Sequence, residues 1–187
     1  MMKKVCVYID GFNVFHAIKK AFGKKYYWIN YKQLARQYID IKNEKLVDVY
    51  YFSAYFYVDK EGVENHKEYV RALQRKGVKI ILGKYLEKDA TFVKKRHPIV
   101  SVKYGDRIDT QKEVIKNLPV PDLLTYNKYE EKRTDVNMAV QIVIDGLQDK
   151  YDKAIIITGD SDIAPAIEAI KRIKQKEFLA VIPIGRK

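Results

Sequence analysis

The chain has 187 residues, 47% of them apolar, which is enough for one domain with a substantial core. Its 36 lysines and arginines against 24 aspartates and glutamates give a net charge of +12, which favours a polyanionic partner, nucleic acid first and an anionic membrane second. A single cysteine excludes an internal disulfide, and three scattered histidines with one cysteine give no zinc-binding pattern.

The apolar runs in this sequence are short. None is long enough to span a bilayer, and the run after Lys4 stops at Asp10, which is too short for a secretory signal peptide. We therefore expect a cytoplasmic protein with no membrane partner. The sequence leaves the oligomeric state open, a homo-oligomer included.

The first part of the chain alternates between predicted strands and helices. Residues 3–9 form an apolar run that predicts a strand. Apolar residues at helical spacing then predict a helix over Asn13–Phe22, closed by Gly23. The elements expected next are a helix over Tyr31–Ile39, a strand over Leu46–Val58, a charged amphipathic helix over Glu61–Lys76 and a strand over Val78–Leu82.

The pattern is less regular from about residue 83 to residue 128. Residues Thr91–Tyr104 fit either a hairpin or an irregular excursion, and the prolines in Leu118–Asp122 exclude the interior of a helix. Regular elements then resume as a helix over Thr134–Leu147, a strand over 154–158, a helix over Ile163–Lys174 and a strand over Phe178–Ile184.

This alternation indicates an α/β fold with three layers, α/β/α, around a central, mostly parallel sheet. We expect a single domain over residues 1–187. A basic excursion around residues 83–128, irregular or a hairpin, is expected to interrupt it.

Two of the apolar strands run into acidic side chains. The first is followed by Asp10 and Asn13, and the strand at 154–158 is followed by Asp160 and Asp162. Each can be structural, because an Asp-Gly pair is an ordinary turn and Asn13 or Asp162 can cap a helix. The carboxyl ends of parallel strands, however, meet at the edge where open α/β sheets bind ligands. We therefore expect the acids of both strands to lie together.

A third acid, Asp135, is expected in the first turn of the helix over 134–147, with Thr134 as its N-cap. There the helix dipole stabilises a carboxylate by less than ~1 kcal/mol, which is a sufficient structural role. Asp135 also shares the apolar face of Met138 and Ile142, so we expect it to point toward the strand ends. Several acids gathered there repel one another unless a cation lies between them, and Mg²⁺ or Mn²⁺ prefers such oxygen ligands.

Three segments resemble the signature blocks of the NYN domain family of PIN-like ribonucleases, with the bacterial LabA-like branch most similar. They are Val7–Asn13, Tyr129–Asn137 and Ile157–Asp162, in the family's order. The resemblance implies a PIN-like (Rossmann-like) sheet in the order 3-2-1-4-5 and metal-dependent cleavage of RNA. It also implies a catalytic site of Asp10, Asp135 and Asp160 as metal ligands, Asp162 as a fourth acid, and Asn13 and Ser161 as polar groups that orient ligands or the scissile phosphate.

The chemistry of phosphodiester hydrolysis agrees with this site. The reaction needs an activated water and stabilised charge on the phosphate, and carboxylate-bound Mg²⁺ or Mn²⁺ supplies both. None of the three histidines lies in the acidic motifs, which disfavours a metal-independent, histidine-based mechanism.

Basic residues with interleaved aromatics over 84–107 suit single-stranded RNA, although a solvated charged hairpin has the same composition. Two further cations, Lys132 and Arg133, lie just before Asp135 in the chain and are well placed to reach a phosphate near the metal. The candidate RNA-binding residues are Lys84, Lys94, Lys95, Arg96, Arg107, Lys132 and Arg133.

Two other functions stay open. A catalytically inactive PIN-like module that binds RNA or protein has the same fold pattern. A Mg²⁺-dependent phosphatase of the haloacid dehalogenase type also places aspartates at strand ends, but its nucleophile precedes the Asp-Gly pair by two positions. This chain has Tyr8 there, which cannot form an aspartyl-phosphate, so this function is the weakest of the three.

Overall fold

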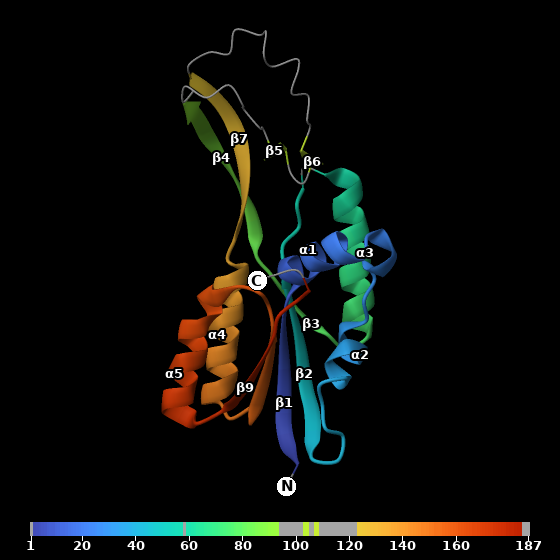
Figure 1. Ribbon diagram of the computed structural model, residues 1–187, viewed down its shortest axis with the longest axis vertical. Helices are drawn as coiled ribbons and strands as arrows, with labels where there is room; N and C mark the ends of the chain where they lie inside the picture. Colours follow the sequence, from blue (N-terminus) through green and yellow to red (C-terminus); the bar gives the residue numbers. More distant parts are fainter. Residues whose placement is uncertain (1, 58, 94–102, 105–106, 109–122, 185–187) are drawn as a thin grey trace. The chain divides into compact units, whose positions relative to one another are not determined.

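The structure is a computed structural model that describes residues 2–57, 59–93, 103–104, 107–108 and 123–184 (Figure 1). The chain forms two units. The first combines Met1–Tyr85 with Glu131–Lys187, and the second is Leu86–Glu130.

The first unit is built on a five-stranded sheet in the order β3-β2-β1-β8-β9 (Figure 1). All neighbouring strands in it run parallel. This confirms the predicted order 3-2-1-4-5, because β8 and β9 are the fourth and fifth strands of this sheet along the chain. The strands are β1 (Lys3–Asp10), β2 (Glu44–Ser53), β3 (Lys79–Leu82), β8 (Lys153–Ile157) and β9 (Glu177–Val181).

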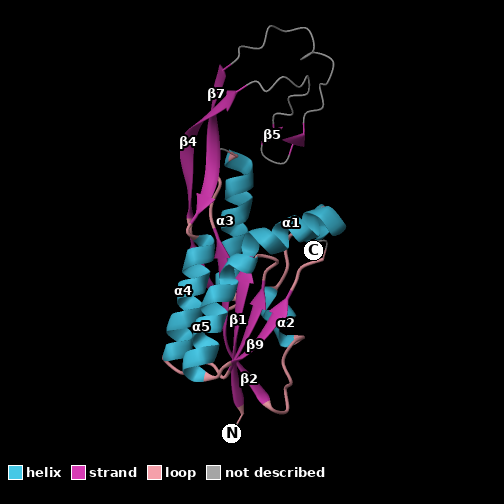
Figure 2. Cartoon of the chain, turned by 60° about the vertical axis from the view of Figure 1, so that its left-hand side comes forward, coloured by secondary structure: helices cyan, strands magenta, loops and turns pink. Residues whose placement is uncertain are grey.

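Helices cover both faces of this sheet, as Figures 1 and 2 show. One face carries α1 (Gly11–Ala21), α2 (Tyr31–Arg36) and α3 (Lys60–Arg75), and the other carries α4 (Thr134–Leu147) and α5 (Ala164–Lys174). Two short 3₁₀ helices, η1 (Lys24–Tyr26) and η2 (Ser161–Ile163), follow α1 and precede α5. The predicted three-layer α/β/α fold is confirmed.

The central position of β1 in the sheet explains why its sequence is an unbroken apolar run. Val5, Val7 and Ile9 pack toward α1, α2 and α3, whereas Cys6 and Tyr8 pack toward α4 and α5. A strand covered on both faces has no solvent-facing side, so its sequence does not alternate between apolar and polar residues. Burial also raises the pKa of the Cys6 thiol to about 12, which keeps it protonated and unreactive.

Most predicted elements are found close to their predicted bounds, and the helix over 134–147 coincides with α4. The strand predicted to reach Val58 ends at Ser53, because its neighbour β3 ends at Leu82, the partner of Ser53. The helix predicted to reach Ile39 ends at Arg36.

The second unit contains most of β4 (Lys84–Val93) and β7 (Leu123–Lys132), which pair in a two-stranded sheet, and the short pair β5 (Lys103–Tyr104) and β6 (Arg107–Ile108). Within it, Lys88 pairs with Glu130 at 3.2 Å and the Tyr129 hydroxyl donates to Glu87 at 3.0 Å. The segment Leu118–Asp122 lies outside the described residues. Among the described helices, none is both long and apolar enough to cross a membrane.

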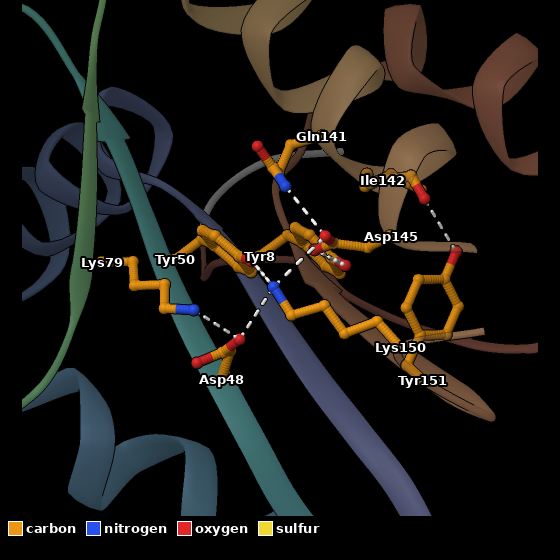
Figure 3. A network of polar contacts seen from close by, with 9 residues as sticks. All are labelled: Tyr8, Asp48, Tyr50, Lys79, Gln141, Ile142, Asp145, Lys150 and Tyr151. Atoms are coloured by element: carbon orange, nitrogen blue, oxygen red, sulfur yellow. Dashed lines mark hydrogen bonds and ion pairs between the residues drawn. The ribbon is translucent and has the colours of Figure 1, made fainter. Parts of the chain in front are cut away.

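A buried polar network holds the C-terminal end of α4 against the sheet (Figure 3). The Asp145 carboxylate is 1% exposed and accepts hydrogen bonds from the Tyr8 hydroxyl (2.8 Å) and the Gln141 side chain (2.9 Å). The Lys150 ammonium lies 3.3 Å from Asp145 and 2.9 Å from Asp48 in β2, and so joins α4 to the sheet. With this end fixed, the N-terminal end of α4 lies near the carboxyl ends of the strands, where Asp135 begins the helix.

Candidate active site

The carboxyl ends of β1 and β8 lie side by side in the middle of the sheet. Ile9 pairs with Ile157, so Asp10 and Thr158 occupy the next positions on the two neighbouring strands. The following strand, β2, lies on one side of β1 and β8 lies on the other, so the strand order reverses here. Such switch points are where open α/β sheets bind ligands. The helix α4 contacts both β1 and η2 beside this point.

Asp10 is a buried carboxylate with three hydrogen-bond donors around it. It is 3% exposed and caps α1, accepting from the Asn13 backbone amide at 2.9 Å. Its second oxygen accepts from the Asn13 side-chain amide (2.5 Å) and from the Thr158 hydroxyl (2.8 Å). The residue after it must be glycine, because a Cβ on Gly11 would lie 2.6 Å from the ring of Tyr51. These contacts fix the Asp10 carboxylate at the strand end.

Asn13 and Thr158 carry this hydrogen bonding across to the loop after β8. The Asn13 side-chain oxygen accepts from the Gly159 amide at 3.2 Å, and the Thr158 hydroxyl accepts from the Asp160 amide at 3.0 Å. The two loops are therefore tied together by side chains, and Asp10 and Asp160 belong to one connected set of hydrogen bonds.

Asp160 caps the short helix η2, accepting from the Asp162 amide at 2.9 Å. Ser161 and Asp162 are exposed at the start of η2. The interpretation of Asp162 as a cap of the following helix is wrong, because the N-cap of α5 is Ile163 and no side chain caps it. The Asp162 carboxylate lies near enough to act on the titration of Asp135.

Asp135 is half-buried in the first turn of α4, and its pKa is raised to about 6. Burial is the main cause, and the negative charges of Asp10, Asp160, Glu131 and Asp162 follow in that order. Asp10, Asp160 and Asp162 are thus close enough to Asp135 for their negative charges to act on its carboxyl group.

Two site residues were not predicted from the sequence. Glu131 accepts a 3.1 Å hydrogen bond from the Thr134 amide and another from the Thr134 hydroxyl, and it adds a fourth acid near Asp135. Thr134 is therefore the first residue of α4 and not its N-cap, which is Arg133 in a left-handed conformation (φ 81°). The second site residue that was not predicted is Thr158. The available signal for it in the sequence was its place directly after a buried strand.

The side chains at this edge have the chemistry of a hard-cation site. Asp10, Asp135, Asp160 and Asp162 offer only carboxylate oxygens, the ligands that Mg²⁺ and Mn²⁺ prefer. Burial, and after it the negative charges of the neighbouring acids, raise the pKa of Asp135. Within the described part of the chain, no three carboxylate, imidazole or thiolate groups are already gathered into a set that could hold a metal ion. The donor type and charge fit such an ion, and the ligand set is not preformed.

The predicted RNA-binding residues fall in several places. Lys84 begins β4, while Lys132 ends β7 and Arg133 lies exposed at the start of α4, next in the chain to the acidic site. Arg107 belongs to β6 in the second unit. The remaining three, Lys94, Lys95 and Arg96, lie outside the described residues.

The sequence profile of the NYN domain matches residues 4–184. The chain belongs to the NYN domain family. This match confirms the family resemblance carried by the three acidic segments. NYN domains are PIN-like and are generally nucleases. The fold that places these segments at one edge of the sheet is the PIN-like one.

Two proteins that are similar to this NYN domain, one in sequence and one in structure, match very different shares of it. The chain is 41% identical to 6-hydroxy-3-succinoylpyridine 3-monooxygenase HspA of Pseudomonas putida over 56 residues, which is 30% of this chain and 18% of that protein. A protein of unknown function from Vibrio parahaemolyticus has a similar crystal structure, with a TM-score of 0.54 and 15% identity over 97% of this chain and 82% of that one. At that identity the likeness concerns the fold alone.

Proposed function

We propose that this NYN domain is a metal-dependent ribonuclease that hydrolyses phosphodiester bonds in single-stranded RNA. The observation that supports the proposal is that Asp10 and Asp160, at the strand-order reversal between β1 and β8, lie close enough to Asp135 on α4 for their charges to act on it. The net charge of +12 supports a polyanionic substrate.

Four carboxylates would hold Mg²⁺ or Mn²⁺, namely Asp10, Asp135, Asp160 and Asp162. When bound, such an ion activates water and stabilises charge on the phosphate oxygens. Asp10 is suited to be the fixed member, because three donors hold it in place. Asp135 and Asp162 are more exposed and have room to adjust to an ion.

The other polar residues would position the substrate. The Asn13 side chain bridges Asp10 and Gly159 and would keep the two acidic loops at a constant separation. The exposed Ser161 hydroxyl can donate to a phosphate oxygen. Lys132 and Arg133 directly precede α4 and would offset the charge of a phosphate brought beside the acids.

The proposal is tested with a single-stranded RNA cleavage assay in Mg²⁺ or Mn²⁺, with and without EDTA. Asp135→Asn is the sharpest variant, because its side chain is half-exposed and an amide there also removes repulsion. Asp10→Asn is less clean, since the new amide would face the donors of Asn13 and Thr158 and weaken the fold. Glu168→Gln, an exposed acid on α5, is the matched control.

We expect EDTA and Asp135→Asn each to abolish cleavage, while Glu168→Gln retains it. Cleavage that survives both treatments would overturn the metal mechanism. Salt-sensitive RNA binding without cleavage in any divalent metal would instead identify an inactive binding module. Turnover of small phosphomonoesters but not of RNA would favour the phosphatase.

A further inference from the structure

The stretch that directly follows Asp10 has an unusual charge distribution. Residues 11–39 contain five lysines and Arg36 but no aspartate or glutamate. With 24 acids in 187 residues, about four would fall in a stretch of this length if they were spread evenly. The stretch forms α1, η1 and α2, and α1 and α2 cover the same face of the sheet (Figure 1).

Three large aromatic side chains in this stretch are exposed, namely Phe22 (54%), Tyr26 (47%) and Trp28 (60%). The rings of Phe22 and Tyr26 meet edge to face at 5.5 Å, and the Lys25 ammonium lies 5.6 Å from the centre of the Tyr26 ring. Trp28 packs its edge on Tyr69 at 5.5 Å, which orients the indole and leaves much of it in solvent. Proteins that bind single-stranded nucleic acid stack its bases on exposed aromatic side chains and contact its phosphates with neighbouring basic side chains such as lysines.

A basic cavity is lined in part by residues that follow these aromatics in the chain. It has a volume of about 410 Å³ and lies between α2 and the end of α3. Its lining provides four cations, two amides and no acid, which suits an anion with several oxygens. The lining residues are Asn30, Lys32, Gln33, Arg36, Arg75 and Lys76.

One helix connects this region to the acidic site. Asp10 caps the N-terminus of α1 and Asn13 lies in its first turn, whereas Lys20 lies in its last turn and Phe22 is its C-cap. The helix has 11 residues and is therefore about 16 Å long. An oligonucleotide within the roughly 4–16 nucleotides typical of a single-strand groove can cover that distance.

We propose that Lys20, Phe22, Lys25, Tyr26, Trp28 and Lys32, with the cavity beside them, form a basic aromatic surface that binds single-stranded RNA and leads it to the acidic site. The proposal rests on the proposed function for the identity of the polyanion. An anionic membrane is a poorer fit, because the charges extend into a polar cavity and the surface continues through α1 to the acids.

The chain contains a built-in probe for this surface, because Trp28 is its only tryptophan. The experiment is a titration of intrinsic tryptophan fluorescence with a 12-nucleotide single-stranded RNA in EDTA, which prevents metal-dependent cleavage. Bases that stack on the indole quench its emission, so we expect saturable quenching. Trp28→Ala, followed with a labelled RNA by anisotropy, should weaken binding at least fivefold.

Two triple variants with the same loss of charge separate a specific surface from general basicity. Lys20→Gln/Lys25→Gln/Lys32→Gln changes the basic aromatic surface. The control Lys42→Gln/Lys45→Gln/Lys60→Gln changes three exposed lysines elsewhere. We expect the first to weaken binding at least tenfold and to lower the slope of log K against log salt by about 2, and the control to weaken binding less than twofold.

Absence of Trp28 quenching, or equal weakening by the two triple variants, would overturn the proposal. Quenching by vesicles containing phosphatidylserine but not by RNA would overturn it in favour of a membrane. The outcome is independent of catalysis. Quenching without cleavage in Mn²⁺ leaves the surface standing and refutes the nuclease, whereas cleavage with an unchanged KM in the surface triple variant refutes the surface and leaves the nuclease.

Discussion

The Thr158 hydroxyl donates a 2.8 Å hydrogen bond to the buried carboxylate of Asp10, joining the ends of two strands that are 148 residues apart. The same hydroxyl accepts from the Asp160 amide at 3.0 Å. The Thr158 side chain thus ties the two acidic loops together, as does that of Asn13. A site made of repelling carboxylates needs such ties, because its own charges push the loops apart.

Thr158→Val should therefore destabilise the fold by about 1–2 kcal/mol, since it keeps the shape of the side chain and removes hydrogen bonds from the buried Asp10 carboxylate and the partly buried Asp160 amide. Urea unfolding measures the change. Ser161→Ala, at an exposed position nearby, is the control and should change the free energy of unfolding by less than about 0.5 kcal/mol. Equal effects of the two variants would show that the Thr158 contacts are not stabilising.

Asp135→Asn should stabilise the protein at neutral pH. The folded state raises the pKa of Asp135 from 3.8 to about 6, so the charged carboxylate is disfavoured there. The resulting loss of stability is absent below about pH 4, grows through the window up to about 6 and is complete above it. A pKa shift of this size changes the free energy of unfolding by about 3 kcal/mol for a fully buried group. Solvent screening at the half-exposed Asp135 reduces the expected gain in the variant to about 1 kcal/mol.

Thermal or urea unfolding of Asp135→Asn and of the wild type at pH 4 and pH 7 measures this gain. The two proteins should be equally stable at pH 4 and separate at pH 7. Glu168→Gln serves as the control with the same change of charge, and a gain at pH 7 in both variants would indicate a general effect of net charge instead.

Cleavage of RNA at limiting Mn²⁺ should rise with pH through about 6, because protons compete with the metal for Asp135. Glu131→Gln removes one of the charges that raise this pKa, so its profile should move to lower pH. The measurement is kcat/KM between pH 5 and 8 at constant ionic strength. A profile that stays in place in Glu131→Gln would show that another group controls the rate.

Lys150→Met should destabilise the protein by about 3 kcal/mol or more, since it leaves the buried carboxylate of Asp145 without its counter-charge. Lys174→Met removes a lysine from an exposed pair with Asp149 and should cost less than about 1 kcal/mol. Chemical unfolding of the two variants compares a buried and an exposed pair directly. A similar loss in both would mean that the network in Figure 3 does not anchor α4.

The sequence alone determined the sheet and the place of the acids on it. Apolar runs covered on both faces identify buried parallel strands, as in β1 and β8, and an acid that ends such a strand must lie at the sheet edge. The places of Asp10 and Asp160 could be predicted for this reason, and that of Asp135 from the apolar face that it shares with Met138 and Ile142. Their positions follow from the periodicity of apolar residues along the chain, which can be seen in the local sequence.

Only the tertiary structure decided which polar side chains meet. The hydrogen bond from Thr158 to Asp10 depends on β8 pairing with β1. The contacts of Asp145 with Tyr8 and Lys150 depend on how α4 lies across β1, β2 and β3. The basic cavity likewise joins Lys32 to Arg75 and Lys76, residues about 40 positions apart. Periodicity fixes which face of an element is buried, whereas polar partners are fixed by register and by the packing of distant elements, which no local pattern contains.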